Sequence, residues 1–328
     1  MQIPNCSIVT GAWACASLIC AAAALPVFAQ SYPVKPVRIV VPFAPGGGVD
    51  LTARILAQRL TDRVGQTFLV ENRTGASGII GTEFVAKAAP DGYTLLVGSQ
   101  TTYAVVPAMY GKIGYDSARD FVGITEIARS PLLIVIHPSL PVKSVRDLIA
   151  LAKSRPGQLT FGAASGGTPH MAGELFKLTA GIDMLFVPYK GEGPAIADAM
   201  GGQISMVFSN LPVSLPLART GKLRGLAVTS LERVPTAPDI PTVSESGLRG
   251  FEASTWFGLF APAATSRDIV MKLNTESAAA LNIPEVKEKM AMQGLFVVAN
   301  SPDQFAGLLK KEIPRWAKVV KDSGVKPQ

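Results

Sequence analysis

Cysteine and histidine are scarce in this sequence. The three cysteines, Cys6, Cys15 and Cys20, all fall within the first 20 residues, and the two histidines are His137 and His170. A structural zinc site takes four Cys or His ligands, and a disulfide framework needs an even set of spaced cysteines. The body of the chain is therefore predicted to hold no such metal site, no disulfide and no cysteine nucleophile.

Motifs of catalysis and of cofactor binding are also lacking. No stretch follows the GxGxxG dinucleotide fingerprint or ends in the Gly-Lys-Ser/Thr of a P-loop. Ser165 and His170 are the one pair that suggests a nucleophile with its base, and no GxSxG elbow surrounds the serine. Asp50, Glu174 and Glu192 are isolated in sequence, which suits helix caps or exposed faces better than an acid–base pair. We predict no catalytic residue, no metal and no cofactor.

Charge is absent from the first 30 residues, and this segment has the character of an export signal. An apolar run of small residues fills positions 11–29, and Val27-Phe28-Ala29 fits the small-x-small cleavage rule. We predict a signal peptide over residues 1–29, cleaved after Ala29, and an exported mature protein. The run lacks a positive charge before it and approaches spanning length, so an uncleaved membrane anchor is the competing interpretation. Lipoprotein processing at Cys20 fits less well, because Ile19 is bulky.

The charge balance is basic but dispersed. The chain carries 31 Lys and Arg against 24 Asp and Glu, a formal net charge of +7. The basic residues are scattered among acids and form no stripe with interleaved aromatics, so nucleic acid is not predicted as a partner. A generally cationic surface that attracts small anions, or one that serves solubility alone, fits the pattern.

Short β-branched runs alternate with amphipathic segments along the rest of the chain, which predicts an α/β protein. The predicted strands cover residues 37–41, 68–70, 93–97, 132–136, 159–163, 185–187, 204–208, 226–229 and 257–260. The predicted helices start at residues 50, 82, 144, 170, 194, 267, 285 and 301. Short connections of this kind favour parallel sheets covered on both faces, and the length favours two such lobes. We expect the chain to cross between them after Ile127 and near 254–257.

Four loops that follow predicted strands are rich in Gly, Ser and Thr: 42–50, 98–102, 164–170 and 188–193. In open α/β sheets ligands bind at such loops, and a glycine loop that enters a helix directs backbone N–H groups and the helix dipole at an anion. Taken singly, each loop is explained by a tight turn. Together they predict a shared anion-binding cleft. Trp256, at the start of a strand near a crossing, is the best aromatic candidate for its wall.

Several segments resemble the Bug/TctC family of extracytoplasmic substrate-binding receptors. They are VPFAPGG at 41–47 followed by Asp50, VENR at 70–73, AKAAPDGYTL at 86–95, VPYKG at 187–191, LAVTS at 226–230, IPTV at 240–243 and WFGLFAP at 256–262. They occur in order across the whole mature chain. The resemblance implies a two-lobed periplasmic binding protein fold of type II, with two doubly wound lobes joined by two short hinge crossings.

The resemblance also implies a function and a site. The receptor would reside in the periplasm, capture a small organic carboxylate by hinge closure, and deliver it to a tripartite tricarboxylate transporter permease or a sensor kinase. The ligand-binding residues it implies are Phe43, Pro45, Gly46, Gly47, Asp50, Ser99, Ser165, Gly166, Thr168, His170, Tyr189 and Ser209. Many members carry an aspartate where this chain has Ser209, so a mono- or dicarboxylate ligand is favoured over an amino acid.

The predicted lobes are residues 30–130 with 255–328, and residues 131–254, and the receptor is expected to be a monomer. Two other functions compete with this one. An exported α/β hydrolase would use Ser165 and His170, and an envelope interaction protein would bind no small molecule.

Overall fold

The computed structural model describes residues 32–189 and 191–326, and the predicted signal peptide over 1–29 lies outside them. The chain divides into two compact units, Met1–Val34 and Lys35–Gln328, and the fold is that of the second. Across the described residues, none of the helices has the length and apolar character that crossing a membrane requires.

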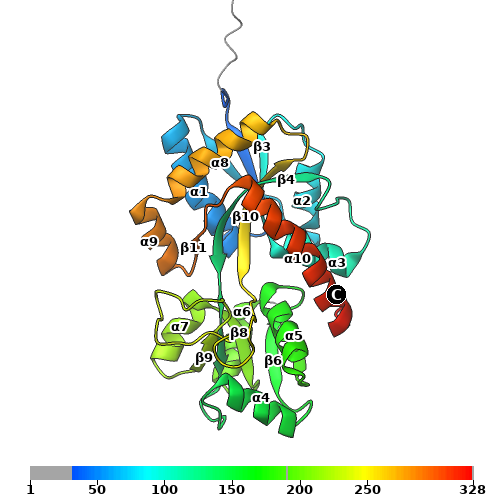
Figure 1. Cartoon of the computed structure of the whole chain (residues 1–328), viewed down its shortest axis with the longest axis vertical. Helices are drawn as coiled ribbons and strands as arrows, with labels where there is room; N and C mark the ends of the chain where they lie inside the picture. Colours follow the sequence, from blue (N-terminus) through cyan, green and yellow to red (C-terminus); the bar gives the residue numbers. More distant parts are fainter. Residues whose placement is uncertain (1–31, 190, 327–328) are drawn as a thin grey trace, which may run out of the picture. The chain divides into compact units, whose positions relative to one another are not determined.

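Two β-sheets organise the unit (Figure 1). The first has the strand order β11-β4-β10-β3-β1-β2, and the second has the order β7-β6-β8-β5-β9. The strands of the first sheet are β1 (Val37–Val41), β2 (Phe68–Asn72), β3 (Thr94–Ser99), β4 (Phe121–Ser130), β10 (Thr255–Pro262) and β11 (Phe296–Val297). Those of the second are β5 (Leu132–Ile136), β6 (Thr160–Ala164), β7 (Leu185–Tyr189), β8 (Met206–Asn210) and β9 (Arg224–Val228).

Both sheets are mixed, which corrects the expectation of parallel sheets. β1 pairs in parallel with β2 and β3, and β6 with β7 and β8. The short edge strand β11 is antiparallel to β4. The other exceptions are β10, antiparallel to β3 and β4, and β5, antiparallel to β8 and β9. These two strands enter directly from the other sheet, so they start at the edge where the parallel strands end and must run in the opposite direction.

Helices cover the faces of both sheets. They are α1 (Gly48–Val64), α2 (Ile79–Ala86), α3 (Val106–Tyr110), α4 (Val145–Ser154), α5 (Thr168–Ala180), α6 (Glu192–Met200), α7 (Leu211–Arg219), α8 (Arg267–Leu281), α9 (Pro284–Met292) and α10 (Pro302–Ser323). Short 3₁₀ and π segments occupy Ala76–Gly78 and Thr101–Val105. Figure 1 shows α4, α5, α6 and α7 with the second sheet and α1 and α8 with the first.

The central strand β5 explains why the second sheet is covered on both faces. All five of its residues are fully buried. Leu132, Ile134 and Ile136 pack in one hydrophobic cluster and Leu133 and Val135 in another, since successive side chains of a strand point to opposite faces. A continuous aliphatic run is the sequence signature of such a doubly covered strand.

The chain passes between the sheets at two short segments, and buried polar contacts join these segments. β4 ends at Ser130 and β5 begins at Leu132, while β10 begins at Thr255 after the loop that follows β9. Leu132 donates its backbone N–H to the Thr229 hydroxyl at 2.8 Å, and the Ala253 N–H donates to the Thr229 carbonyl at 3.0 Å. The two passages are therefore fastened to one another at Thr229.

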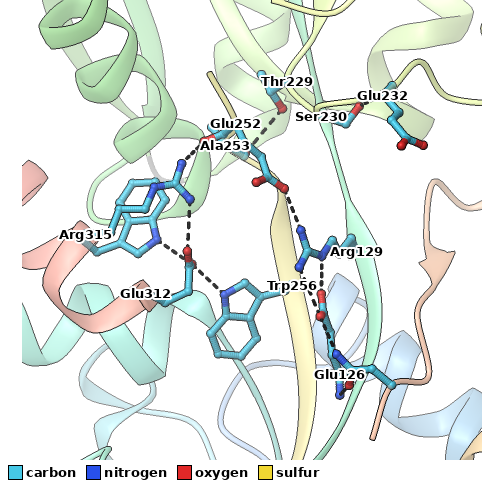
Figure 2. Close-up of polar contacts among 12 residues, drawn as sticks. Glu126, Arg129, Thr229, Ser230, Glu232, Glu252, Ala253, Trp256, Glu312 and Arg315 are labelled. Atoms are coloured by element: carbon cyan, nitrogen blue, oxygen red, sulfur yellow. Dashed lines mark hydrogen bonds and ion pairs between the residues drawn. The ribbon is translucent and has the colours of Figure 1, made fainter. Parts of the chain in front are cut away.

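An ion-pair network extends this junction (Figure 2). Arg129 donates to both Glu126 and Glu252, with 2.7 Å between its Nη1 and Glu252 Oε1. Glu312 on α10 accepts from the indole N–H groups of Trp256 and Trp316, each at 2.8 Å, and from Arg315. Burial of the carboxyl raises the pKa of Glu126, although Arg129 opposes the shift.

Helix α10 also links the two sheets, by packing its side chains against the first sheet and against a helix of the second. Its first half places Phe305 in the core of the first sheet, and its last turns pack Trp316, Val319 and Val320 against Met171 of α5. Pro314 lies inside this helix without ending it.

Candidate functional site

A cavity of about 730 Å³ opens where the parallel strands of both sheets end. The first sheet lines it with the β1–α1 loop, the end of β3 and the start of β10, and the second with the starts of α5, α6 and α7. Its lining includes Phe43, Ala44, Pro45, Gly46, Gly47, Gly48, Ser99, Thr101, Ser130, Gly167, Thr168, Pro169, Gly191, Glu192, Asn210, Thr255 and Phe257.

The helices that begin at this cavity lack side-chain caps. The N-cap residues of α1, α5 and α6 are Gly47, Gly167 and Gly191, and none supplies a capping side chain. By contrast, three helices that begin elsewhere are capped by serine hydroxyls, from Ser144 on α4, Ser266 on α8 and Ser301 on α10. First-turn N–H groups carry the positive end of the helix dipole. Glycine caps therefore leave these groups for a bound anion.

The first glycine loop is held in shape by Asp50. Gly46 adopts a φ of 89°, a left-handed conformation that favours glycine, and its N–H donates to Asp50 Oδ2 at 2.9 Å. Arg54 and Asn72 donate to the same carboxylate, each at 2.9 Å. Although burial opposes the effect, these hydrogen bonds together hold the pKa of Asp50 below its usual value. The carboxylate is occupied with the loop, and Asp50 does not line the cavity.

The second glycine loop repeats this arrangement with His170. Gly166 has a φ of 72°, and its N–H donates to His170 Nδ1 at 3.0 Å. Gly167 then caps α5 with an extended backbone, as Gly47 caps α1. In both loops the acceptor lies four residues after the first glycine. Asp50 and His170 are thus equivalent positions, and each shapes a loop from beneath the cavity lining.

The surroundings of His170 set its protonation state. Its ring is 3% exposed and stacks on Phe186 at a centroid distance of 3.7 Å. Burial, with a smaller effect from Lys177, lowers the pKa of His170 to about 4. Since Nδ1 accepts from Gly166, the proton of the neutral ring lies on Nε2, which is 3.8 Å from Glu174. Neither ring nitrogen is available as a general base for Ser165.

The structure separates the twelve predicted site residues into two groups. Phe43, Pro45, Gly46, Gly47, Ser99 and Thr168 line the cavity, whereas Asp50, Ser165, Gly166, His170, Tyr189 and Ser209 are not among its lining residues. The Tyr189 hydroxyl donates to Asp198 at 2.7 Å. Ser209 is fully buried and donates to Glu192 at 2.5 Å. For every residue of both groups, a contact with ligand stays a prediction.

Trp256 does not form the wall expected of it. It is 2% exposed and its indole N–H is bound to Glu312, because β10 turns this side chain towards α10. The next residue, Phe257, points to the opposite face and lines the cavity.

Other residues that line the cavity were not predicted from the sequence, because their positions depend on how the strands pair. Ser130 and Thr255 face the cavity at the paired ends of β4 and β10, a pairing that no local pattern encodes. Glu192 was assigned to a cap or exposed face, yet it lines the cavity from the first residue of α6. Its position in the glycine-rich loop at 188–193 could have indicated that it lies at the cavity. Within the described part of the chain, no three His, Cys, Asp or Glu residues cluster as metal ligands would.

Comparisons with known proteins agree with this architecture. Residues 52–325 match the family described as tripartite tricarboxylate transporter family receptor. The chain is 42% identical to protein BugT of Bordetella pertussis over 305 residues, which cover 92% of this chain and 94% of BugT.

Solved structures are similar over nearly the whole chain. The structure of R. palustris Rpa4515 with adipate has 40% identity and a TM-score of 0.78, and the match covers 90% of this chain and all of that one. MatC (Rpa3494) from Rhodopseudomonas palustris with bound malate has 33% identity and a TM-score of 0.74, over 88% of this chain and all of that one. The predicted two-lobed α/β periplasmic binding protein fold is confirmed, and the family is one of receptors and not of enzymes. The chain belongs to the TctC family of tripartite tricarboxylate transporter receptors, which are periplasmic solute-binding proteins.

Proposed function

We propose that this receptor binds a small organic carboxylate in the cavity between its two sheets. The observation that carries the proposal is the pair of glycine-capped helix starts, at Gly47 and Gly167, that face this one cavity from opposite sheets. A carboxylate placed there would accept hydrogen bonds from backbone N–H groups of both helices. The bound adipate and malate named for two similar structures support the same ligand class.

Thr168 adds a hydroxyl donor to the second helix start. It is 5% exposed and lines the cavity as the first residue of α5. Hydrogen bonds to a charged acceptor are worth about 1.5–3 kcal/mol each. Backbone groups and one hydroxyl can therefore hold a carboxylate without an arginine clamp.

We assign residues 30–130 with 255–328 to one lobe and residues 131–254 to the other, with closure about the passages at Ser130–Leu132 and Ala253–Thr255. Two short passages fastened at Thr229 permit rotation of one lobe against the other and resist sliding. A ligand that contacts both glycine loops favours the closed arrangement. The receptor would be exported by cleavage after Ala29, act as a monomer, and deliver its ligand to a tripartite tricarboxylate transporter-type permease or a sensor.

The test is a thermal-shift screen of the purified chain, followed by calorimetry, with mono-, di- and tricarboxylates as ligands and sugars and esters as controls. A ligand at 100 times its dissociation constant stabilises the fold by about 2.7 kcal/mol. We expect carboxylates alone to shift the transition. A screen in which sugars or esters shift it and carboxylates do not would contradict the proposal.

The variant Gly47→Val tests whether the first glycine loop forms part of the binding site. A Cβ at Gly47 would have only the Ala44 carbonyl oxygen within 4 Å, at 4.0 Å, and the backbone φ of −83° accepts any residue. The variant should fold normally, while its methyl groups occupy the space of the ligand carboxylate and abolish binding. Gly307→Val on the exposed part of α10, where a Cβ meets nothing within 4 Å, is the matched control and should bind as the parent does. Retained affinity in Gly47→Val would remove the first loop from the site.

A further inference from the structure

Glu192 is an unexpected member of the lining of an anion-binding cavity. Of the described residues that form this lining, it is the one with a charged side chain, and the charge is negative. The residue opens helix α6 directly after Gly191 and is half-buried. A carboxylate so placed must affect which anions the cavity accepts.

Three hydrogen bonds from the protein hold this carboxylate in position. The Ser209 hydroxyl donates to Oε1 at 2.5 Å, the Asn210 backbone N–H donates to Oε1 at 2.6 Å, and the Asn210 side-chain amide donates to Oε2 at 2.7 Å. A carboxylate offers about four acceptor positions, so three of the four are filled. Such a group has little freedom to move aside for a ligand.

The strand order shows where this group lies. Glu192 follows β7, its partners end β8, and β6 lies between these two strands. The side chain therefore reaches across the carboxyl end of β6, beside the loop that leads to the glycine cap of α5. Ser209 and Asn210 precede α7, and Asn210 is its N-cap. Two N–H donors and a hydroxyl at a helix start form the kind of donor set that receives a ligand carboxylate. Here the chain's own carboxylate occupies it.

The remainder of the cavity is suited to an uncharged group. Apolar side chains from both sheets line it, including Phe43, Leu51, Val207, Phe208, Phe257 and Leu295. These residues can cover an aliphatic or aromatic tail, and the described part of the lining contributes no cation to receive a second negative charge.

We propose that Glu192 makes this receptor selective for monocarboxylates with an apolar tail and excludes dicarboxylates, because it fills a second carboxylate-binding position and repels an anion that approaches it. The inference rests on the proposed function and specifies its ligand class. Two like charges about 6 Å apart near a protein surface repel strongly enough to lower affinity by roughly 100-fold.

Matched pairs of acids test the proposal by calorimetry on the purified chain at pH 7.5. The pairs are pentanoate with glutarate, hexanoate with adipate and octanoate with suberate, which differ within a pair in the second carboxylate. For the parent protein we expect each dicarboxylate to bind at least tenfold more weakly than its partner. In Glu192→Ala the ratio of the two dissociation constants should fall at least tenfold, because the donors of Ser209 and Asn210 become available. Glu192→Gln, which keeps the size of the side chain and removes its charge, should give an intermediate ratio.

Glu288→Ala, which removes an exposed acid on α9, is the charge-matched control and should leave the ratio at its parent value. Equal affinities within a pair in the parent, or a ratio that does not change in Glu192→Ala, would overturn the proposal and leave carboxylate binding intact. Tenfold tighter binding of 6-aminohexanoate than of hexanoate would also overturn it, since Glu192 would then be receiving a ligand cation. If no acid of any pair binds to either protein, the proposed function itself fails, and this inference with it.

Discussion

The stability of the fold should depend on pH through His170. In the folded state burial lowers the pKa of His170 to about 4, from 6.5 in a solvated chain. The unfolded chain therefore binds one more proton than the folded chain between these two values. The unfolding free energy should be highest above pH 6.5, fall as the pH is lowered, and reach its full loss below pH 4.

Lowering the pKa of His170 from 6.5 to about 4 corresponds to about 3 kcal/mol of unfolding free energy. Between pH 7.5 and pH 5, linkage gives a loss of about 2 kcal/mol from this residue alone. The conversion applies because the ring is 3% exposed and its Nδ1 must accept from Gly166, which a protonated ring cannot do.

The variant His170→Asn isolates the contribution of His170 to the pH dependence of stability. An amide oxygen at this position can accept from the Gly166 N–H, as Asp50 accepts from the Gly46 N–H in the first loop. Glu174, whose pKa is raised by burial in spite of Lys177, remains in both proteins. We would measure urea unfolding of parent and variant at pH 7.5, 6 and 5. The difference between their unfolding free energies should change by about 2 kcal/mol over this range. A difference that stays constant with pH would refute the buried, neutral assignment of His170.

Four further substitutions follow from local contacts. Gly81→Ala and Gly307→Ala make the same change inside helices with opposite expected outcomes in urea titration. A Cβ at Gly81 would lie 2.5 Å from the Arg73 carbonyl oxygen, so Gly81→Ala should lower the unfolding free energy. A Cβ at Gly307 meets open space, so Gly307→Ala should raise the unfolding free energy by about 0.5–1 kcal/mol. Glu312→Ala leaves two buried indole N–H groups without an acceptor, at about 1–3 kcal/mol each, and should lower the urea midpoint where Glu288→Ala does not. Thr168→Val should weaken carboxylate binding by about 1–3 kcal/mol in calorimetry with no loss of melting temperature, and an unchanged affinity would leave backbone contacts as the anchor.

Local patterns in the sequence were sufficient for most elements. The aliphatic run 132–136 and the amphipathic segment 267–281 coincide with β5 and α8. Ser301 and Gln304 form a capping box at the start of α10, where a helix was predicted to start. The elements that were not anticipated, β4, β11, α3 and α7, have weaker local signals. β4 contains Gly123, Glu126 and Arg129, which are stable in a strand only because α10 and the segment 252–256 surround them.

In the candidate site, too, some features could be predicted from local sequence and others could not. Its glycine loops could be located from the sequence, because a positive φ at Gly46 and Gly166 and an uncapped helix start are local requirements of the backbone. The roles of Asp50 and His170 could not be predicted from the sequence, since each role depends on whether the side chain turns towards its own loop or towards the cavity. That choice follows from packing against Arg54 and Asn72 in one loop and Phe186 in the other.

By itself, the sequence determined the α/β class, the family and the glycine loops, because these depend on residue types and on short-range spacing. The tertiary structure alone decided that β5 and β10 run antiparallel to their neighbours, that Phe257 and not Trp256 faces the cavity, and that Glu192 reaches across β6 to Ser209 and Asn210. Each of these results depends on which strands become neighbours. That order is set by burial of apolar faces over the whole chain, so no window of the sequence contains it.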